Sequence, residues 1–296
     1  MPYEERWFTT FDGLRLRAKS WSPAKGPSAV IVLVHGFTEH SGRYAHLAAH
    51  LCQRGHAVCA IDLRGHGGSQ GDRAWVRSFD DYLADVEGFI GQVRQKYPGK
   101  PLFVLGHSMG GTVVVLLGID RRLAATGAIV SGAELKMPPH LFPVLRRLAG
   151  LASRVCPRLR LVRLGMKRLS RDPQVVADFE ADPLNFHGRF TVRIGAEILR
   201  AVRRITPRME DVRVPLLILH ASADAVADVE GSRELYARAG SADKGLKIYD
   251  GLYHDLFHEP EKDRVVADVV EWLEARAGSD QSDRGEAGWT AAATRL

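Results

Sequence analysis

The sequence has no hydrophobic run long enough to cross a bilayer. Apolar runs such as residues 29–34 and 102–105 are far shorter than the ~20 residues that a spanning helix needs. Residues 1–6 (MPYEER) are polar and acidic, whereas a secretory signal begins with basic residues followed by an apolar stretch. We therefore expect a cytoplasmic protein that touches membranes only peripherally.

Cysteine is scarce and odd in number. The three cysteines, Cys52, Cys59 and Cys156, do not have the spacing of a metal site or a disulfide framework. We interpret them as reduced, mostly buried thiols, and we expect no metal and no organic cofactor. The 296 residues are enough for one large α/β domain with an inserted subdomain, and a composition of 45% hydrophobic and 26% charged residues is ordinary for a soluble globular protein.

Positive charge is concentrated in one segment. Residues 134–208 contain 16 Lys/Arg and 6 Asp/Glu, whereas the rest of the chain contains 25 and 29. This imbalance favours contact with an anionic membrane or an anionic substrate, although a solvated helical face would give the same pattern. No nucleic-acid-binding motif accompanies the charge, so we expect no nucleic-acid partner.

Strand-like and helix-like segments alternate along the first part of the chain. Two β-like stretches, residues 6–10 and 14–21, flank Asp12-Gly13 and predict an antiparallel hairpin at a sheet edge. Continuous apolar runs then alternate with amphipathic helical patterns, as in a parallel sheet covered on both faces. The predicted strands are residues 29–34, 57–61, 102–105 and 127–130, and the predicted helices are residues 44–53, 79–96 and 112–119.

The alternation stops after Ser131 and resumes near residue 214. The intervening residues are helix-rich and contain seven prolines, which is typical of an insertion. Strands 214–219 and 246–249 and helices 229–239 and 259–277 follow. We predict a core formed by residues 1–133 and 209–277, a helical cap at residues 134–208 and a flexible tail at residues 278–296.

A G-x-S-x-G sequence lies between a predicted strand and a predicted helix. Residues 106–110 read GHSMG. A serine on such a sharp turn has an exposed hydroxyl, and Gly106 and Gly110 leave the crowded turn free of side chains. The pattern predicts that Ser108 is a catalytic nucleophile.

A serine nucleophile needs a histidine base and an acid, which follow it in the order acid, then histidine, in this type of fold. Asp224 follows strand 214–219 and is the predicted acid, with Asp228 and Asp250 as alternatives; Asp228 also suits a helix N-cap. His254 follows the last predicted strand and is the predicted base. Of the other histidines, His66 suggests loop packing, His107 belongs to the turn itself, and His258 suggests a cap or a pocket lining.

Attack on an ester produces an oxyanion that needs two preorganised donors. Met109 follows the nucleophile at a helix N-terminus, and Phe37 follows His35-Gly36 after the first parallel strand. We predict that the backbone amides of Phe37 and Met109 form the oxyanion hole.

These motifs resemble those of monoacylglycerol lipases of the α/β-hydrolase superfamily, over about residues 5–276. The resemblance lies in residues 35–44 (HGFTEHSGRY), 62–69 (DLRGHGGS), 106–110 and 253–254, and in DPL at 182–184 and GAEIL at 195–199 of the insertion. It implies an α/β-hydrolase fold with a mostly parallel central sheet, helices on both faces and an inserted helical cap. By the same resemblance, Ser108, Asp224 and His254 form the triad, and Phe37 and Met109 form the oxyanion hole.

The resemblance implies a serine hydrolase that releases a fatty acid and glycerol from a monoacylglycerol. Relatives with nearly the same motifs are lysophospholipases or broad carboxylesterases, and the motifs do not separate these substrates. Some members hold glycerol with a polar residue one turn beyond the base, whereas this turn reads Asp255-Leu256-Phe257-His258. An acyltransferase also remains an alternative, as does a sensor that binds an acyl compound without turnover.

Bulky apolar residues and arginines alternate at helical spacing in residues 141–151 (LFPVLRRLAGL). This pattern is typical of a helix on a lipid interface. The same segment could instead line an acyl tunnel or simply cover the sheet.

Overall fold

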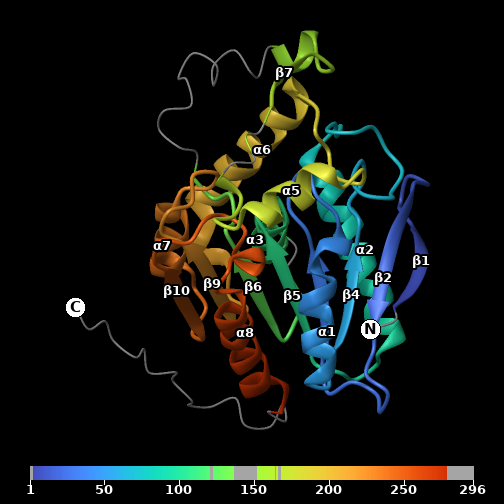
Figure 1. The fold of residues 1–296 in the computed structure, drawn as a ribbon, viewed down its shortest axis with the longest axis vertical. Coiled ribbons are helices and arrows are strands. Elements are labelled where there is room, and N and C mark those ends of the chain that lie inside the picture. Colours follow the sequence, from blue (N-terminus) through green and yellow to red (C-terminus); the bar gives the residue numbers. More distant parts are fainter. Residues whose placement is uncertain (1–2, 121–122, 137–151, 164, 166–167, 279–296) are drawn as a thin grey trace.

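A computed structural model describes residues 3–120, 123–136, 152–163, 165 and 168–278 (Figure 1). Among these residues, eight strands form one sheet in the order β1-β2-β4-β3-β5-β6-β9-β10. Within this sheet, only the pairs β1/β2 and β2/β4 are antiparallel, so the N-terminal hairpin forms one edge of an otherwise parallel sheet. The strands are β1 (Glu4–Thr9), β2 (Arg15–Trp21), β3 (Val30–Val34), β4 (Ala57–Ile61), β5 (Leu102–His107), β6 (Gly127–Ser131), β9 (Leu216–Ala221) and β10 (Lys244–Tyr249).

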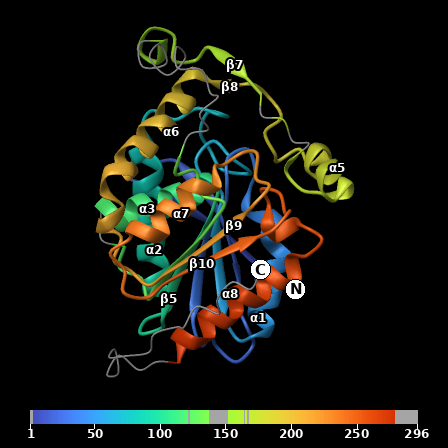
Figure 2. The same ribbon diagram turned by 90° about the vertical axis from the view of Figure 1, so that its left-hand side faces the viewer.

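Helices cover both faces of this sheet (Figures 1 and 2). Successive residues of β3 face opposite sides: Val30 and Val32 pack with α2, α3 and α7, and Ile31 and Leu33 pack with α1 and α8. This arrangement explains why the parallel strands are apolar at every position, because both of their faces are buried. The core helices are α1 (Ala45–Gln53), α2 (Phe79–Lys96), α3 (Met109–Asp120), α7 (Val229–Arg238) and α8 (Lys262–Ala277), with the short 3-10 helices η1 (Ser41–Tyr44) and η4 (Leu256–His258). The predicted α/β-hydrolase fold is confirmed.

The described part of the chain between β6 and β9 arches over the carboxyl ends of the strands (Figure 2). Its described elements are β7 (Arg160–Val162), α5 (Pro173–Ala181), β8 (Phe190–Thr191), α6 (Val192–Ile205) and η3 (Thr206–Asp211). The sequence predicts a helix-rich insertion but does not predict the pairing of β7 with β8. The predicted interface helix at residues 141–151 lies outside the described residues, as do residues 279–296 of the predicted tail.

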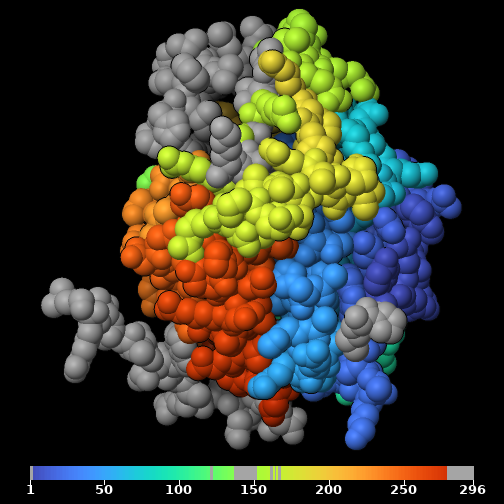
Figure 3. All heavy atoms as spheres, in the orientation of Figure 1, coloured from blue at the N-terminus to red at the C-terminus, as the bar shows by residue number. Residues whose placement is uncertain are grey.

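Hydrogen bonds attach this insertion to the core on two sides. On one side, the Glu197 carboxylate of α6 accepts from the backbone N–H of Phe79 at the start of α2, at 3.1 Å. On the other side, His40 Nε2 lies 2.8 Å from Asp182 Oδ2, just after α5. In Figure 3 the segment that contains α5 lies across the surface formed by the N-terminal and C-terminal parts of the core. The boundaries that we predict for core, cap and tail remain predictions.

Burial of the cysteines differs in part from the prediction. Cys52 and Cys59 are buried free thiols, but Cys156 in the insertion is exposed. Among the described residues, no helix has both the length and the apolar character that crossing a membrane requires.

Candidate active site

Ser108 occupies a tight turn between β5 and α3. Its φ of 51° is left-handed, a conformation that is strained for a residue with a side chain. The backbone N–H of Ser108 donates to Ser131 at 2.8 Å, which holds the turn against β6. A Cβ atom on Gly110 would lie 2.2 Å from the Val34 carbonyl oxygen, so only glycine fits at that position. The sequence predicts this turn correctly.

The structure brings Ser108, His254 and Asp224 together. The Ser108 hydroxyl lies 3.0 Å from Nε2 of His254, and Nδ1 of His254 lies 2.7 Å from Oδ2 of Asp224. The three residues follow β5, β10 and β9, and the carboxyl ends of parallel strands meet at one edge of the sheet. An ionised Asp224 accepts a hydrogen bond from the Nδ1–H group, which leaves Nε2 unprotonated and able to accept the proton of Ser108.

The surroundings of Asp224 keep its carboxyl group charged. Burial alone would raise its pKa, but the charge of His254 and hydrogen bonds from His220 and His254 hold the pKa well below its usual range. The other carboxylate oxygen accepts from the backbone N–H groups of Val226 and Ala227, at 2.7 and 3.0 Å. This carboxylate is therefore fixed in one orientation, toward His254.

The pairing with Asp224 raises the pKa of His254. Burial alone would lower the pKa of His254, but the Asp224 charge and hydrogen bond raise it above its ordinary value of 6.5. The imidazole of His107, whose ring centroid is 4.9 Å from that of His254, is buried, and its pKa is lowered to about 4. His107 is consequently neutral near pH 7 and adds no second positive charge beside the base.

The two alternative acids make other contacts. Asp228 caps α7 by accepting from the N–H of Glu230 at 2.9 Å, and Asp250 accepts from the hydroxyl of Ser222 at 2.9 Å. The sequence reasoning missed His220, whose Nε2 lies 3.3 Å from Asp224 Oδ2. The available signal is a histidine at the end of an otherwise apolar strand, four residues before the acid.

The predicted oxyanion loop lies directly beside Ser108. A Cβ atom on Gly36 would lie 3.0 Å from the Ser108 Cβ, and the Gly36 N–H donates to Glu39 Oε1 at 2.6 Å. Phe37 follows, with its ring against Phe190 of β8 at 5.9 Å. Met109 is the first residue of α3, and the first amides of a helix have no acceptor within it. The positions of Phe37 and Met109 are consistent with the predicted donor pair.

The other histidines that we considered have structural contacts. His66 is buried, and its Nδ1 bonds the carbonyl oxygen of Arg64 at 3.0 Å. Nδ1 of His258 lies 2.7 Å from Asp255 Oδ1, and its Nε2 lies 3.0 Å from the carbonyl oxygen of Arg43. His258 is thus part of a buried polar network, not an N-cap.

A family model described as serine aminopeptidase, S33 matches residues 25–261. The monoacylglycerol lipase of Mycolicibacterium smegmatis is 35% identical over 269 residues, which cover 91% of this chain and 96% of that protein. The chain belongs to the monoacylglycerol lipase family of the α/β-hydrolase superfamily. Another member of this family, the monoglyceride lipase of Rattus norvegicus, is 35% identical over 280 residues, covering 93% of this chain and 92% of its own.

Solved structures of the family agree with this assignment. A soluble variant of the monoglyceride lipase of Saccharomyces cerevisiae, in complex with a substrate analog, has a TM-score of 0.84 and 25% identity. The match covers 93% of this chain and 96% of that structure. The family resemblance that the sequence motifs indicate is confirmed.

Proposed function

We propose that this chain is a serine hydrolase that cleaves the ester bond of monoacylglycerols to a fatty acid and glycerol. The observation that carries the proposal is the continuous hydrogen-bonded line from Ser108 through His254 to Asp224, with distances of 3.0 and 2.7 Å. Membership of the monoacylglycerol lipase family supports the substrate class.

The reaction begins with acylation of Ser108. Nε2 of His254 accepts the hydroxyl proton while Oγ attacks the ester carbonyl. The negative charge then moves to the carbonyl oxygen, where the amides of Phe37 and Met109 donate to it, assisted by the positive N-terminal end of α3. His254 returns the proton to the glycerol oxygen, the C–O bond breaks, and glycerol leaves.

Deacylation repeats these steps with water as the nucleophile. His254 accepts a proton from water, the hydroxide attacks the acyl carbonyl, and the proton passes to Ser108 Oγ as the fatty acid leaves. Asp224 stabilises the positive imidazole in both halves of the reaction.

Fluorophosphonate labelling tests the nucleophile. We expect covalent modification of the wild-type protein at Ser108 and none in Ser108→Ala, with ester hydrolysis reduced by many orders of magnitude. Ser222→Ala is the matched control, since its hydroxyl contacts Asp250 on a nearby loop. A folded Ser108→Ala variant with unchanged hydrolysis would refute the proposal.

A substrate panel tests which alcohol group and which acyl-chain length the enzyme prefers. We expect monoacylglycerols to have a higher kcat/KM than lysophospholipids and simple alkyl esters of the same acyl length. Each buried methylene contributes ~0.8 kcal/mol, so kcat/KM should rise with chain length until the site is filled. A preference for lysophospholipids would instead assign the phospholipid-directed alternative, and labelling without turnover would favour the acyl-ligand sensor.

We also propose that the protein acts in the cytoplasm and that its cap contacts anionic membranes peripherally. Two apolar side chains of the insertion, Val155 and Leu159, are 70% and 48% exposed, beside the exposed Arg154. Interfacial cations contribute ~1 kcal/mol each near anionic lipid and are screened by salt. Sedimentation with phosphatidylserine-containing vesicles should therefore weaken as salt rises.

Paired substitutions locate the membrane contact. The double variant Val155→Ser, Leu159→Ser should bind these vesicles less than wild type, whereas Trp7→Ser should not differ, because the exposed Trp7 lies on edge strand β1. Binding that is independent of both salt and the two apolar side chains would reject a contact by this part of the insertion.

A further inference from the structure

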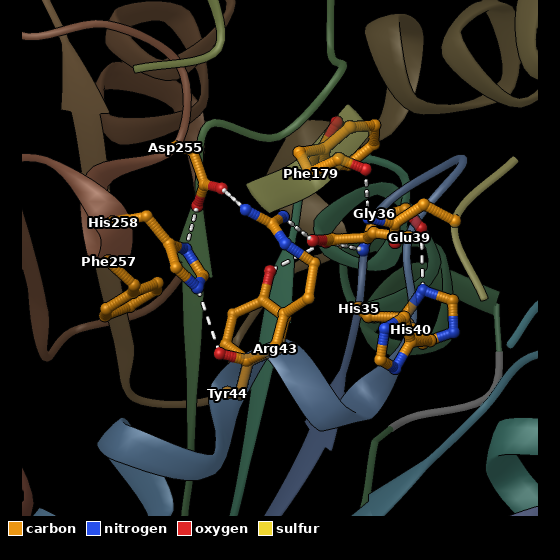
Figure 4. A network of polar contacts seen from close by, with 12 residues as sticks. His35, Gly36, Glu39, His40, Arg43, Tyr44, Phe179, Asp255, Phe257 and His258 are labelled. Atoms are coloured by element: carbon orange, nitrogen blue, oxygen red, sulfur yellow. Dashed lines mark hydrogen bonds and ion pairs between the residues drawn. The ribbon is translucent and has the colours of Figure 1, made fainter. Parts of the chain in front are cut away.

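We propose that Arg43 is a positioning residue that holds the oxyanion loop and the His254 loop at a fixed separation. Figure 4 shows its guanidinium between the carboxylates of Glu39 and Asp255. The inference rests on the proposed function, because it concerns the geometry in which Ser108 reacts.

Both contacts of the guanidinium are buried. Arg43 Nη2 lies 2.7 Å from Asp255 Oδ2, and Nη1 pairs with Glu39 Oε2. The side chains of Arg43, Glu39 and Asp255 are 9%, 4% and 0% exposed. One fork-shaped cation thus bonds two carboxylates away from solvent, which a point charge on a flexible stem does less well.

Each carboxylate is directly linked to one half of the candidate site. Asp255 is the residue after His254 in the chain. Glu39 accepts from the N–H of Gly36, and Gly36 is the oxyanion-loop residue that approaches Ser108. Arg43 therefore connects the loop after β3 with the loop after β10, whose bonded residues are 212 positions apart.

The surrounding contacts restrict the network further. The hydroxyl of Tyr44 donates to Glu39 Oε1 at 2.7 Å. His258 contacts both Asp255 and the carbonyl oxygen of Arg43 (Figure 4). Burial alone would raise the pKa of Glu39, but Arg43 and His107 lower it to about 2, so this carboxylate is ionised at neutral pH.

The insertion also contacts this network. The ring of Phe179 in α5 lies over the Arg43 guanidinium at 4.9 Å, and the Asp255 N–H donates to the carbonyl oxygen of Leu169 at 2.9 Å. The segment above the site and the two loops below it therefore meet at Arg43. A shift in any of the three would move the carboxylate of Glu39 or Asp255.

The expected catalytic effect follows from how precisely the oxyanion-hole donors must be placed. A displacement of about 1 Å at a reacting group costs about 100-fold in rate. A lysine at position 43 keeps the charge but lacks the fork that reaches both carboxylates. We therefore expect Arg43→Lys to lower kcat per active site about 10- to 100-fold, while KM changes less than about threefold.

The experiment compares Arg43→Lys and Asp255→Asn with Arg64→Lys. Arg64 is a matched control because it is also buried and bonds two carboxylates, Asp12 at 3.0 Å and Asp85 at 2.6 Å, outside the candidate site. Active sites are titrated with a fluorophosphonate, and kcat and KM are measured on a short-chain p-nitrophenyl ester together with Tm. Arg64→Lys should lower Tm but leave kcat per titrated site within about twofold of wild type.

Asp255→Asn allows a second measurement, the pH dependence of kcat/KM, which would not change if this network only stabilised the fold. After Asp224, Asp255 is the charge that most raises the pKa of His254. Removing its charge should lower the pKa of His254, so the acidic limb of kcat/KM should move to lower pH in Asp255→Asn and stay in place in Arg64→Lys.

An unchanged kcat per titrated site in folded Arg43→Lys would overturn the inference, even if Tm falls. Should Arg43→Lys fail to fold, Asp255→Asn decides: an unaltered kcat with an unmoved acidic limb would also overturn it. If wild-type protein is not labelled at Ser108, the proposed function fails. If wild type is labelled and the variants match it, only the role of Arg43 fails.

Discussion

Nδ1 of His254 lies 2.7 Å from Oδ2 of Asp224, and both side chains are buried. The Asp224 charge outweighs burial and raises the pKa of His254 above 6.5. Because a base must be unprotonated, kcat/KM of wild type should rise with pH to a plateau, with a midpoint above 6.5. In Asp224→Asn that midpoint should fall and kcat should drop about 10⁴-fold. A wild-type midpoint well below 6.5 in the pH–rate profile would contradict this electrostatic assignment.

His220 is a second hydrogen-bond donor to Asp224, and it should matter less than His254. Its Nδ1 lies 2.7 Å from the hydroxyl of Ser232, which orients the ring. A hydrogen bond to a charged group contributes about 1.5–3 kcal/mol, so His220→Leu should lower kcat about tenfold. His56→Leu serves as the control, since His56 is buried beside Ser28 at the opposite, amino end of β4. Equal kcat values for both variants would remove His220 from the site.

Glu134 should make the folded state less stable at alkaline pH. It follows β6, its Oε1 atom is buried without a partner among the described residues, and burial raises its pKa from 4.5 to about 8. The folded state therefore holds a proton that the unfolded chain releases, so its stability falls as pH rises from about 4.5 to 8. Glu134→Gln cannot ionise, and its Tm should exceed that of wild type at pH 9 but not at pH 4. If the difference in Tm between Glu134→Gln and wild type were the same at pH 4 and pH 9, Glu134 would not be protonated in the folded state.

Two glycine-to-alanine substitutions should have opposite effects. A Cβ at Gly110 would lie 2.2 Å from a backbone oxygen, whereas a Cβ at Gly91, within α2, would have no atom within 4 Å. Gly91→Ala should stabilise the protein by about 0.5–1 kcal/mol, because alanine restricts the unfolded chain. Gly110→Ala should destabilise the turn and abolish fluorophosphonate labelling. Denaturant unfolding of both variants measures the contrast, and a neutral Gly110→Ala would contradict the close packing of the turn.

The strands and core helices could be predicted because their patterns are local. Helix α2 begins and ends where the sequence predicts, since Ser78 and Asp81 form a capping box at its N-terminus. Ser108, Asp224 and His254 could be proposed because each follows an apolar strand and the strands' carboxyl ends share one edge.

Other features depend on contacts that no local pattern encodes. The bridge through Arg43 joins residues 212 positions apart, and its formation depends on the final packing of two loops. Strands β7 and β8 have three and two residues, too few for a period-two pattern. The exposure of Cys156 follows from its place in the insertion, not from its residue type, which is usually buried.

Peptide mass mapping of protein quenched in acid during ester turnover tests the central claim most directly. The account predicts one acyl group on the peptide that contains Ser108, and neither that group nor measurable turnover in a folded Ser108→Ala variant. An acyl group on another residue, or turnover by Ser108→Ala at the wild-type rate, would contradict it.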